Sequence, residues 1–191
     1  ASLPGHQEIL IANNDGPAAQ KILSFPGEPI DVSGVFTNED NLLFLKRPNA
    51  STNLTYVYQG NRWVSTPSPL DSIRWSWIYY NKTDRTYWII AETQLTQYDY
   101  NFRVLRHYNN DNGMPGVKIH GLIPDNRGNI WFNTDRSIFQ LNTKTGTITM
   151  LAEKDGFLPQ NLGELSRTKD DDGNLYIAAD GAGFYRIRPD K

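Results

Sequence analysis

The sequence predicts an all-β protein built from repeated four-stranded antiparallel sheets, and three observations support this. The segments Asp125–Phe132 and Asp170–Ile177 share one pattern and place Trp131 and a tyrosine 45 residues apart. Trp88 lies 43 residues before Trp131, and Leu43 lies 45 residues before Trp88. The apolar runs are four to eight residues long and bounded by Gly, Asn and Asp, with no sustained period of 3.6. Spacings of 43 to 45 residues are typical of propeller blades, so we expect a β-propeller of about four to five blades.

The clearest repeat divides into four expected strands. An alternating inner strand is expected at Val117–Pro124 and is followed by the turn Asp125–Asn129. Gly and Asn suit that turn because they tolerate a positive φ. The remaining three strands of this blade are expected at Ile130–Asn133, Ser137–Leu141 and Thr147–Leu151. Almost no helix is expected anywhere in the chain.

The same pattern divides the whole chain into blades. Full blades are expected at residues 32–69, 73–109 and 117–151, with part-blades at 7–26 and 164–189. The part-blades either combine to close a small propeller, so that residues 1–191 form a single domain, or the chain is the C-terminal part of a larger propeller. An unclosed arc would leave sheet edges exposed and would favour a homo-oligomer.

Composition excludes several classes of function. The chain has 19 Lys and Arg against 21 Asp and Glu, so no basic field indicates a nucleic-acid partner. It has no Cys and only 3 His, which are far apart, so no metal site is expected. No nucleophile elbow, phosphate loop or dinucleotide fingerprint occurs, so neither a cofactor nor catalytic residues are expected. No apolar run reaches the roughly 20 residues that span a bilayer.

The later repeats resemble a known family, the two-component regulator propeller repeat. The resemblance is carried by a D-x-x-G-N-L-W pattern, an apolar strand and a late D-G-L-P, and it covers about residues 110–189. Asn133 and Ala178 stand where the family usually has Gly, and Tyr176 stands where it has Trp. The segments that match are Gly128–Thr134, Ile138–Asn142, Asp155–Pro159, Asp172–Ile177 and Gly183–Ile187.

The resemblance implies an extracytoplasmic sensor. In that family such propellers look like the periplasmic sensor half of Bacteroidetes hybrid two-component systems, which recognise glycan fragments. We therefore expect a non-catalytic, periplasmic or extracellular propeller that binds a small molecule or an oligosaccharide. Any kinase, and any membrane span, would lie outside this chain. Two alternatives stay open, a propeller-type polysaccharide lyase or hydrolase and a protein-interaction scaffold.

Six residues are candidates for ligand contact. The segment Arg74–Tyr80 is expected to be an innermost strand, on which Trp75, Trp77 and Tyr79 share one face. Their rings would stack on a sugar while Arg74 bonds its hydroxyl or acid groups; the alternative is packing between blades. His120, Arg136 and Arg167 lie on or beside other inner strands and would converge on the same site. Their alternatives are a structural role for His120 and a solvated Asp135–Arg136 pair.

Two sets of residues are assigned a structural role. Trp88, Trp131 and Tyr176 are expected to pack between neighbouring blades. The segments Asp125–Asn129 and Asp170–Asn174 look like calcium loops, but they lack a ligand at every second position and are expected to be turns.

Overall fold

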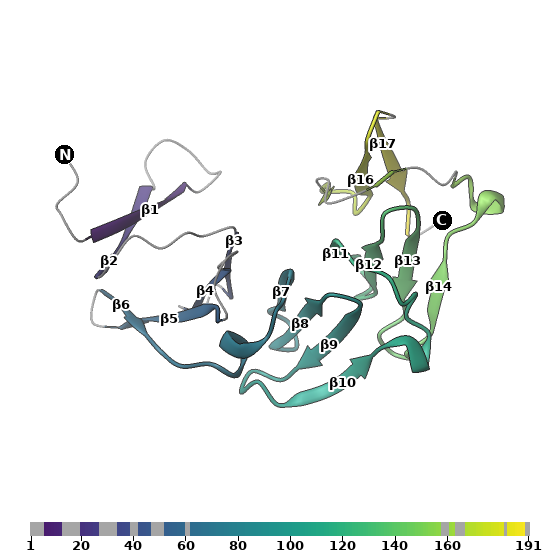
Figure 1. The fold of residues 1–191 in the computed structure, drawn as a ribbon. Helices are drawn as coiled ribbons and strands as arrows, with labels where there is room; N and C mark the ends of the chain where they lie inside the picture. Colours follow the sequence, from purple (N-terminus) through teal and green to yellow (C-terminus); the bar gives the residue numbers. More distant parts are fainter. Residues whose placement is uncertain are drawn as a thin grey trace. The chain divides into compact units, whose positions relative to one another are not determined.

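The computed structural model describes residues 6–12, 20–26, 34–38, 42–46, 52–59, 62–157, 161–162, 167–181 and 183–189. Every sheet in these residues is antiparallel, and their only helical segments are three short 3-10 turns, so the all-β prediction is confirmed (Figure 1). The chain forms two compact units, residues 1–74 and 75–191, which we describe separately.

The first unit contains two sheets. β1 (His6–Ala12) pairs with β2 (Gln20–Pro26). A four-stranded sheet follows in chain order, made of β3 (Gly34–Thr37), β4 (Leu42–Lys46), β5 (Leu54–Gln59) and β6 (Arg62–Ser65). The 3-10 turn η1 (Pro69–Ser72) is attached to this sheet by the Thr55 hydroxyl, which donates to Asp71 Oδ1 at 2.7 Å.

The second unit contains three sheets, each formed by strands that are consecutive in the chain. The first sheet consists of β7 (Trp77–Asn81), β8 (Thr86–Ala91), β9 (Gln94–Tyr98) and β10 (Val104–Tyr108), and η2 (Asn110–Asn112) follows it. The second consists of β11 (Gly121–Pro124), β12 (Ile130–Asn133), β13 (Ile138–Leu141) and β14 (Ile148–Met150), followed by η3 (Glu153–Asp155). The third consists of β15 (Arg167–Lys169), β16 (Leu175–Ala179) and β17 (Gly183–Ile187). The first strands of the three sheets lie side by side, as the contacts of β11 with both β7 and β15 show.

The expected inner strands are longer than the observed ones. β11 begins at Gly121, since the Ile119 amide donates to the Glu92 carbonyl at 2.9 Å, in the loop between β8 and β9. The preceding residues cross from one sheet to the next, and Val117 is 52% exposed. In the same way β7 begins at Trp77, so Arg74 and Trp75 precede the strand instead of belonging to it. The prediction that these segments were inner strand is therefore wrong for their N-terminal halves.

The other strands of the clearest repeat are confirmed to within one residue. β12 has the expected bounds, and β13 and β14 are each slightly shorter than expected. Alternation along β12 explains the match: Ile130 and Phe132 pack toward the sheet β7–β10, and Trp131 packs toward β15–β17.

Two apolar cores join the three sheets of this unit. Trp88 belongs to the core between β7–β10 and β11–β14, and Trp131 belongs to the core between β11–β14 and β15–β17. Both are nearly fully buried, so the expected packing between blades is confirmed for these two residues. Tyr176 is half-buried and contacts Phe184 at 5.6 Å between ring centroids.

The two Asp-rich segments are turns, as expected. The Asp125 carboxylate accepts from the backbone amides of Arg127 and Asn129 at 2.9 Å each. It also accepts from Asn129 Nδ2 at 2.8 Å and from Trp131 Nε1 at 3.0 Å. Gly128 has a φ of 84°, a conformation that Gly adopts without strain. The turn therefore fixes the orientation of the indole that follows it.

The second turn repeats this arrangement with a tyrosine. Asp170 accepts from the Asn174 amide and Nδ2 at 2.8 Å each and from the Tyr176 hydroxyl at 2.9 Å. The side-chain hydrogen bond from Asn174, above all, holds the pKa of Asp170 below its usual value, and burial only partly opposes it. The hydrogen bond that the Tyr176 hydroxyl donates to Asp170 raises the pKa of Tyr176.

Candidate functional site

Arg167 is the centre of a polar cluster on the first strands of the second unit. Its guanidinium carbon lies 4.9 Å from the centroid of the Trp77 ring, within the range of a cation–π contact. Its Nη2 donates to Asn133 Oδ1 at 3.2 Å. Residues from β7, β12 and β15 therefore meet around one half-buried cation.

Gly121 makes this arrangement possible. A Cβ at position 121 would collide with the guanidinium of Arg167, so the cation lies directly against the β11 backbone. Only glycine leaves that space, and glycine within a strand often marks such a close approach. The arginine is thus held between a ring, a backbone and an amide.

His120 lies next to this cluster and is held by a carboxylate. Its Nε2 lies 2.6 Å from Asp135 Oδ1, while its backbone amide donates to the Asn133 carbonyl at 3.0 Å. The imidazole side chain is only 6% exposed, whereas that of Asp135 is 69% exposed. The Nδ1 atom of His120 is buried, and its Nε2 atom is bound to Asp135. The short segment from Asn133 to Asp135 therefore organises both His120 and Arg167.

The structure brings three of the six candidate residues together. Trp77 and Arg167 are in contact, and His120 lies beside them. Trp75 is 2% exposed, so almost none of its ring reaches solvent. Arg136 is exposed in the loop between β12 and β13, and Arg74 is exposed in the first unit.

Three contributors to the cluster were not among the candidate residues. Gly121 and Asn133 contact Arg167, and Asp135 binds His120 instead of forming only a solvated pair with Arg136. The signal for Gly121 was its position inside an apolar strand. Asn133 was visible only as a departure from the family pattern, which usually has Gly there.

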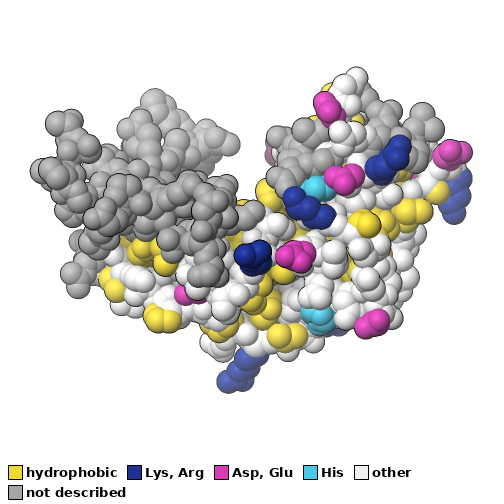
Figure 2. All heavy atoms as spheres, viewed as in Figure 1, with side chains coloured by type: hydrophobic (Ala, Val, Ile, Leu, Met, Phe, Trp, Pro, Cys, Tyr) yellow, Lys and Arg dark blue, Asp and Glu magenta, His cyan; other side chains and the backbone are white. Residues whose placement is uncertain are grey.

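The visible face carries both signs of charge, intermixed over the described residues (Figure 2). Within the part of the chain that the structure describes, no three His, Asp or Glu side chains gather as a metal site would require. The described residues contain no helix that is long and apolar enough to cross a bilayer.

Comparisons with known proteins identify the fold. No protein family and no curated protein matches this sequence. Among solved structures, the chain is similar to the extracellular domain of the putative hybrid two-component system BT4673 from B. thetaiotaomicron, with a TM-score of 0.60 and 20% identity over 83% of this chain and 23% of that one. It is also similar to the extracellular domain of BT3049 from the same organism, with a TM-score of 0.55 and 13% identity over 95% and 31% of the two chains.

Enzymes share the fold as well. A streptogramin B lyase matches with a TM-score of 0.63 and 15% identity over 96% of this chain and 55% of that one. All these identities are low, and this chain spans about a quarter to a half of the matched chains. The likeness therefore establishes a propeller-type, all-β fold, as the repeat spacing predicted.

Proposed function

We propose that this chain is a non-catalytic, ligand-sensing propeller module of a two-component signalling protein, located outside the cytoplasm. Two observations support the proposal. The repeats resemble those of sensor propellers, and the fold is similar to extracellular domains of two hybrid two-component systems. The residue cluster around Arg167 then provides the candidate ligand site.

The observation that carries the ligand proposal is the fixed position of Arg167. A guanidinium is a planar group with five N–H donors, well suited to sugar hydroxyls and carboxylates. Contact with Trp77 and Gly121 reduces the conformational freedom that this side chain would lose on binding. Trp77 is itself half-buried, so an indole surface lies beside the cation. A glycan fragment, with hydroxyls around apolar ring faces, is the ligand that matches such a pair.

The test is a thermal-shift screen with a broad panel of neutral and acidic oligosaccharides, followed by calorimetry on any hit. We expect a hit to lose at least tenfold in affinity in Arg167→Met, which keeps an apolar stem and removes the donors. Lys144→Ala, an exposed change in the hairpin before β14, is the matched control and should bind normally. If no oligosaccharide raises the melting temperature, the glycan proposal is wrong.

A second candidate function is a propeller lyase, favoured by the 2.6 Å contact between His120 and Asp135 and by the fold shared with streptogramin B lyase. A histidine held by a carboxylate is a common general base. The buried Nδ1 of His120 argues against it, because the ring would have to turn before it reached a substrate. Turnover of a cyclic ester or polysaccharide that disappears in His120→Ala would establish the lyase.

A further inference from the structure

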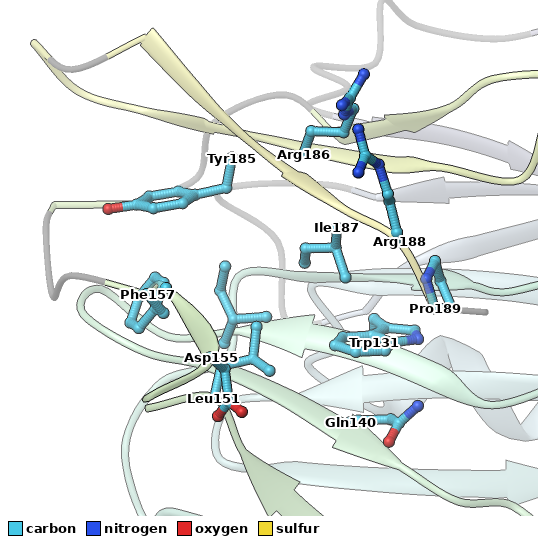
Figure 3. Close-up of a pocket in the computed structure, with 12 residues that line it drawn as sticks. Trp131, Gln140, Leu151, Asp155, Phe157, Tyr185, Arg186, Ile187, Arg188 and Pro189 are labelled. Carbon is cyan, nitrogen blue, oxygen red and sulfur yellow. The ribbon is translucent and has the colours of Figure 1, made fainter. Parts of the chain in front are cut away.

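Two cavities of the second unit differ in the charges that line them. The larger, of about 630 Å³, lies beside β17 and contains side chains of both signs, Asp155 together with Arg186 and Arg188 (Figure 3). The smaller, of about 380 Å³, is a groove lined by Arg106, His107, Tyr108, Lys144, Thr145 and Gly146. The described lining of this groove contains Arg and Lys side chains and no carboxylate, so it favours an anion as its occupant.

The groove lies between two neighbouring sheets that each have four described strands. Arg106 and Tyr108 are two residues apart on β10, so their side chains share one face of the strand. Lys144 and Gly146 belong to the turn between β13 and β14 of the next sheet. The Tyr108 ring is buried in the apolar core that joins these two sheets. The shape of the groove therefore depends on a contact between sheets whose four strands are all described.

Arg106 is held in place across this contact. Its Nη1 donates to the Thr143 carbonyl in the turn between β13 and β14. That turn is fixed in its own right, because Asn142 Oδ1 accepts from the amides of Lys144 and Thr145 at 3.0 and 3.1 Å. A guanidinium has five N–H donors, so one bond to the turn orients the group and leaves the others for a ligand. The cation therefore loses little freedom when a ligand binds.

The Tyr108 hydroxyl is a further donor in the groove. Among the described residues it has no hydrogen-bond partner, and it is not fully buried. The point that a Cβ of Gly146 would occupy lies 3.8 Å from this hydroxyl, so a side chain at position 146 would lie against it. Neither Arg106 nor Lys144 forms an ion pair with a residue that the structure describes. Two cations and a phenol O–H are thus available to the same occupant.

We propose that this groove binds a sulfate or phosphate group of a small molecule, at a site separate from the cluster around Arg167. The Arg106 guanidinium and the Lys144 ammonium balance the negative charge, and the Tyr108 hydroxyl donates to a further oxygen. A tetrahedral oxyanion matches this set, because its oxygens accept hydrogen bonds in several directions and the donors come from two elements. Such charge-assisted hydrogen bonds are roughly twice as strong as neutral ones.

Nuclear magnetic resonance of the isotope-labelled 191-residue chain tests the proposal with sodium phosphate at constant ionic strength, which keeps general screening unchanged. We expect saturable shifts of the Thr145 and Gly146 amide resonances. Arg106→Gln should weaken phosphate binding about tenfold, and Tyr108→Phe, which keeps the buried ring, should weaken it severalfold. Arg103→Gln is the matched control and should bind normally, because Arg103 is an exposed cation just before β10 and does not line the groove.

A second titration distinguishes the sources of the anion. Sodium sulfate is compared with a sulfated monosaccharide and with the same sugar lacking the sulfate. Binding of the first two without binding of the third supports the proposal, and tighter binding of the sulfated sugar than of the free ion makes a sulfated glycan the source. Equal binding of the sugar without sulfate overturns the proposal, since the anionic group would then contribute nothing.

The variants also separate this groove from the cluster around Arg167. Equal effects of Arg106→Gln and Arg103→Gln would overturn the proposal, because phosphate would then respond only to net charge. Loss of phosphate binding in Arg167→Met would overturn it too, since the anion would then lie at the other site. Lys144→Ala should weaken phosphate binding while it leaves oligosaccharide binding around Arg167 intact, so that the failure of either proposed site is seen without the other.

Discussion

The carboxylate of Asp125 should be one of the most important polar groups for the stability of the second unit. It is 4% exposed and accepts four hydrogen bonds, one of them from the buried Trp131 indole. Each hydrogen bond to a charged acceptor contributes about 1.5–3 kcal/mol, but the turn amides regain water when the carboxylate is removed. We therefore expect Asp125→Ala to cost about 3 kcal/mol in the free energy of unfolding.

Chemical denaturation and thermal melting measure this cost. For a domain of this size, 3 kcal/mol corresponds to a fall of roughly 10 °C in melting temperature. Asp171→Ala, an exposed change in the equivalent turn of the next sheet, is the matched control and should change stability by less than about 0.5 kcal/mol. A double-mutant cycle with Trp131→Phe isolates the indole hydrogen bond, with an expected coupling of about 1 kcal/mol. Equal melting temperatures for the Asp125 and Asp171 variants would refute the role assigned to this turn.

Three further predictions concern single side chains. The pKa of Asp170 is lowered in the folded chain, so its contribution to stability is complete above the unfolded pKa of about 3.9 and is lost as the pH falls through the lower folded value. Asp170→Asn should therefore flatten the fall of the denaturant midpoint at acidic pH. An unchanged fall of the midpoint would contradict this prediction. Gly121→Ala should displace the guanidinium of Arg167 yet leave the melting temperature within a few degrees, since only the far end of one side chain moves. Calorimetry should show that the variant no longer binds an oligosaccharide that the unchanged protein binds. Retained affinity would mean that Arg167 does not belong to the ligand site. Gly128→Ala should lower the free energy of unfolding in urea by about 1–2 kcal/mol. The cost comes from the φ of 84° alone, because no described atom lies within 4 Å of the new methyl group. An unaltered urea midpoint would mean that the turn relaxes.

The repeat spacing predicted the sheets because every blade packs against its neighbours in the same way. Trp88 and Trp131 recur because each second strand must cover the face of the next sheet. The alternation of Ile130, Trp131 and Phe132 between two cores follows directly from the period of a strand. Local chemistry was equally visible: an Asp followed by Gly and Asn predicts a turn, and both segments of that kind are turns.

The inner strands were mispredicted for a reason that the pattern does not contain. Val117 and Ile119 continue the alternation of a strand, but the Ile119 amide pairs with Glu92 of the preceding sheet. A polypeptide that crosses between two sheets has the same apolar periodicity as one that pairs within a sheet. Only the partner of each amide separates the two cases.

The cluster around Arg167 was only partly predictable. Trp77 and Arg167 were both candidates, but they are 90 residues apart, and nothing in the sequence says that they touch. Their contact depends on Gly121, which lies between them on the middle of three adjacent strands. Such a contact follows from the stacking of sheets, which a repeat implies in general but does not define residue by residue.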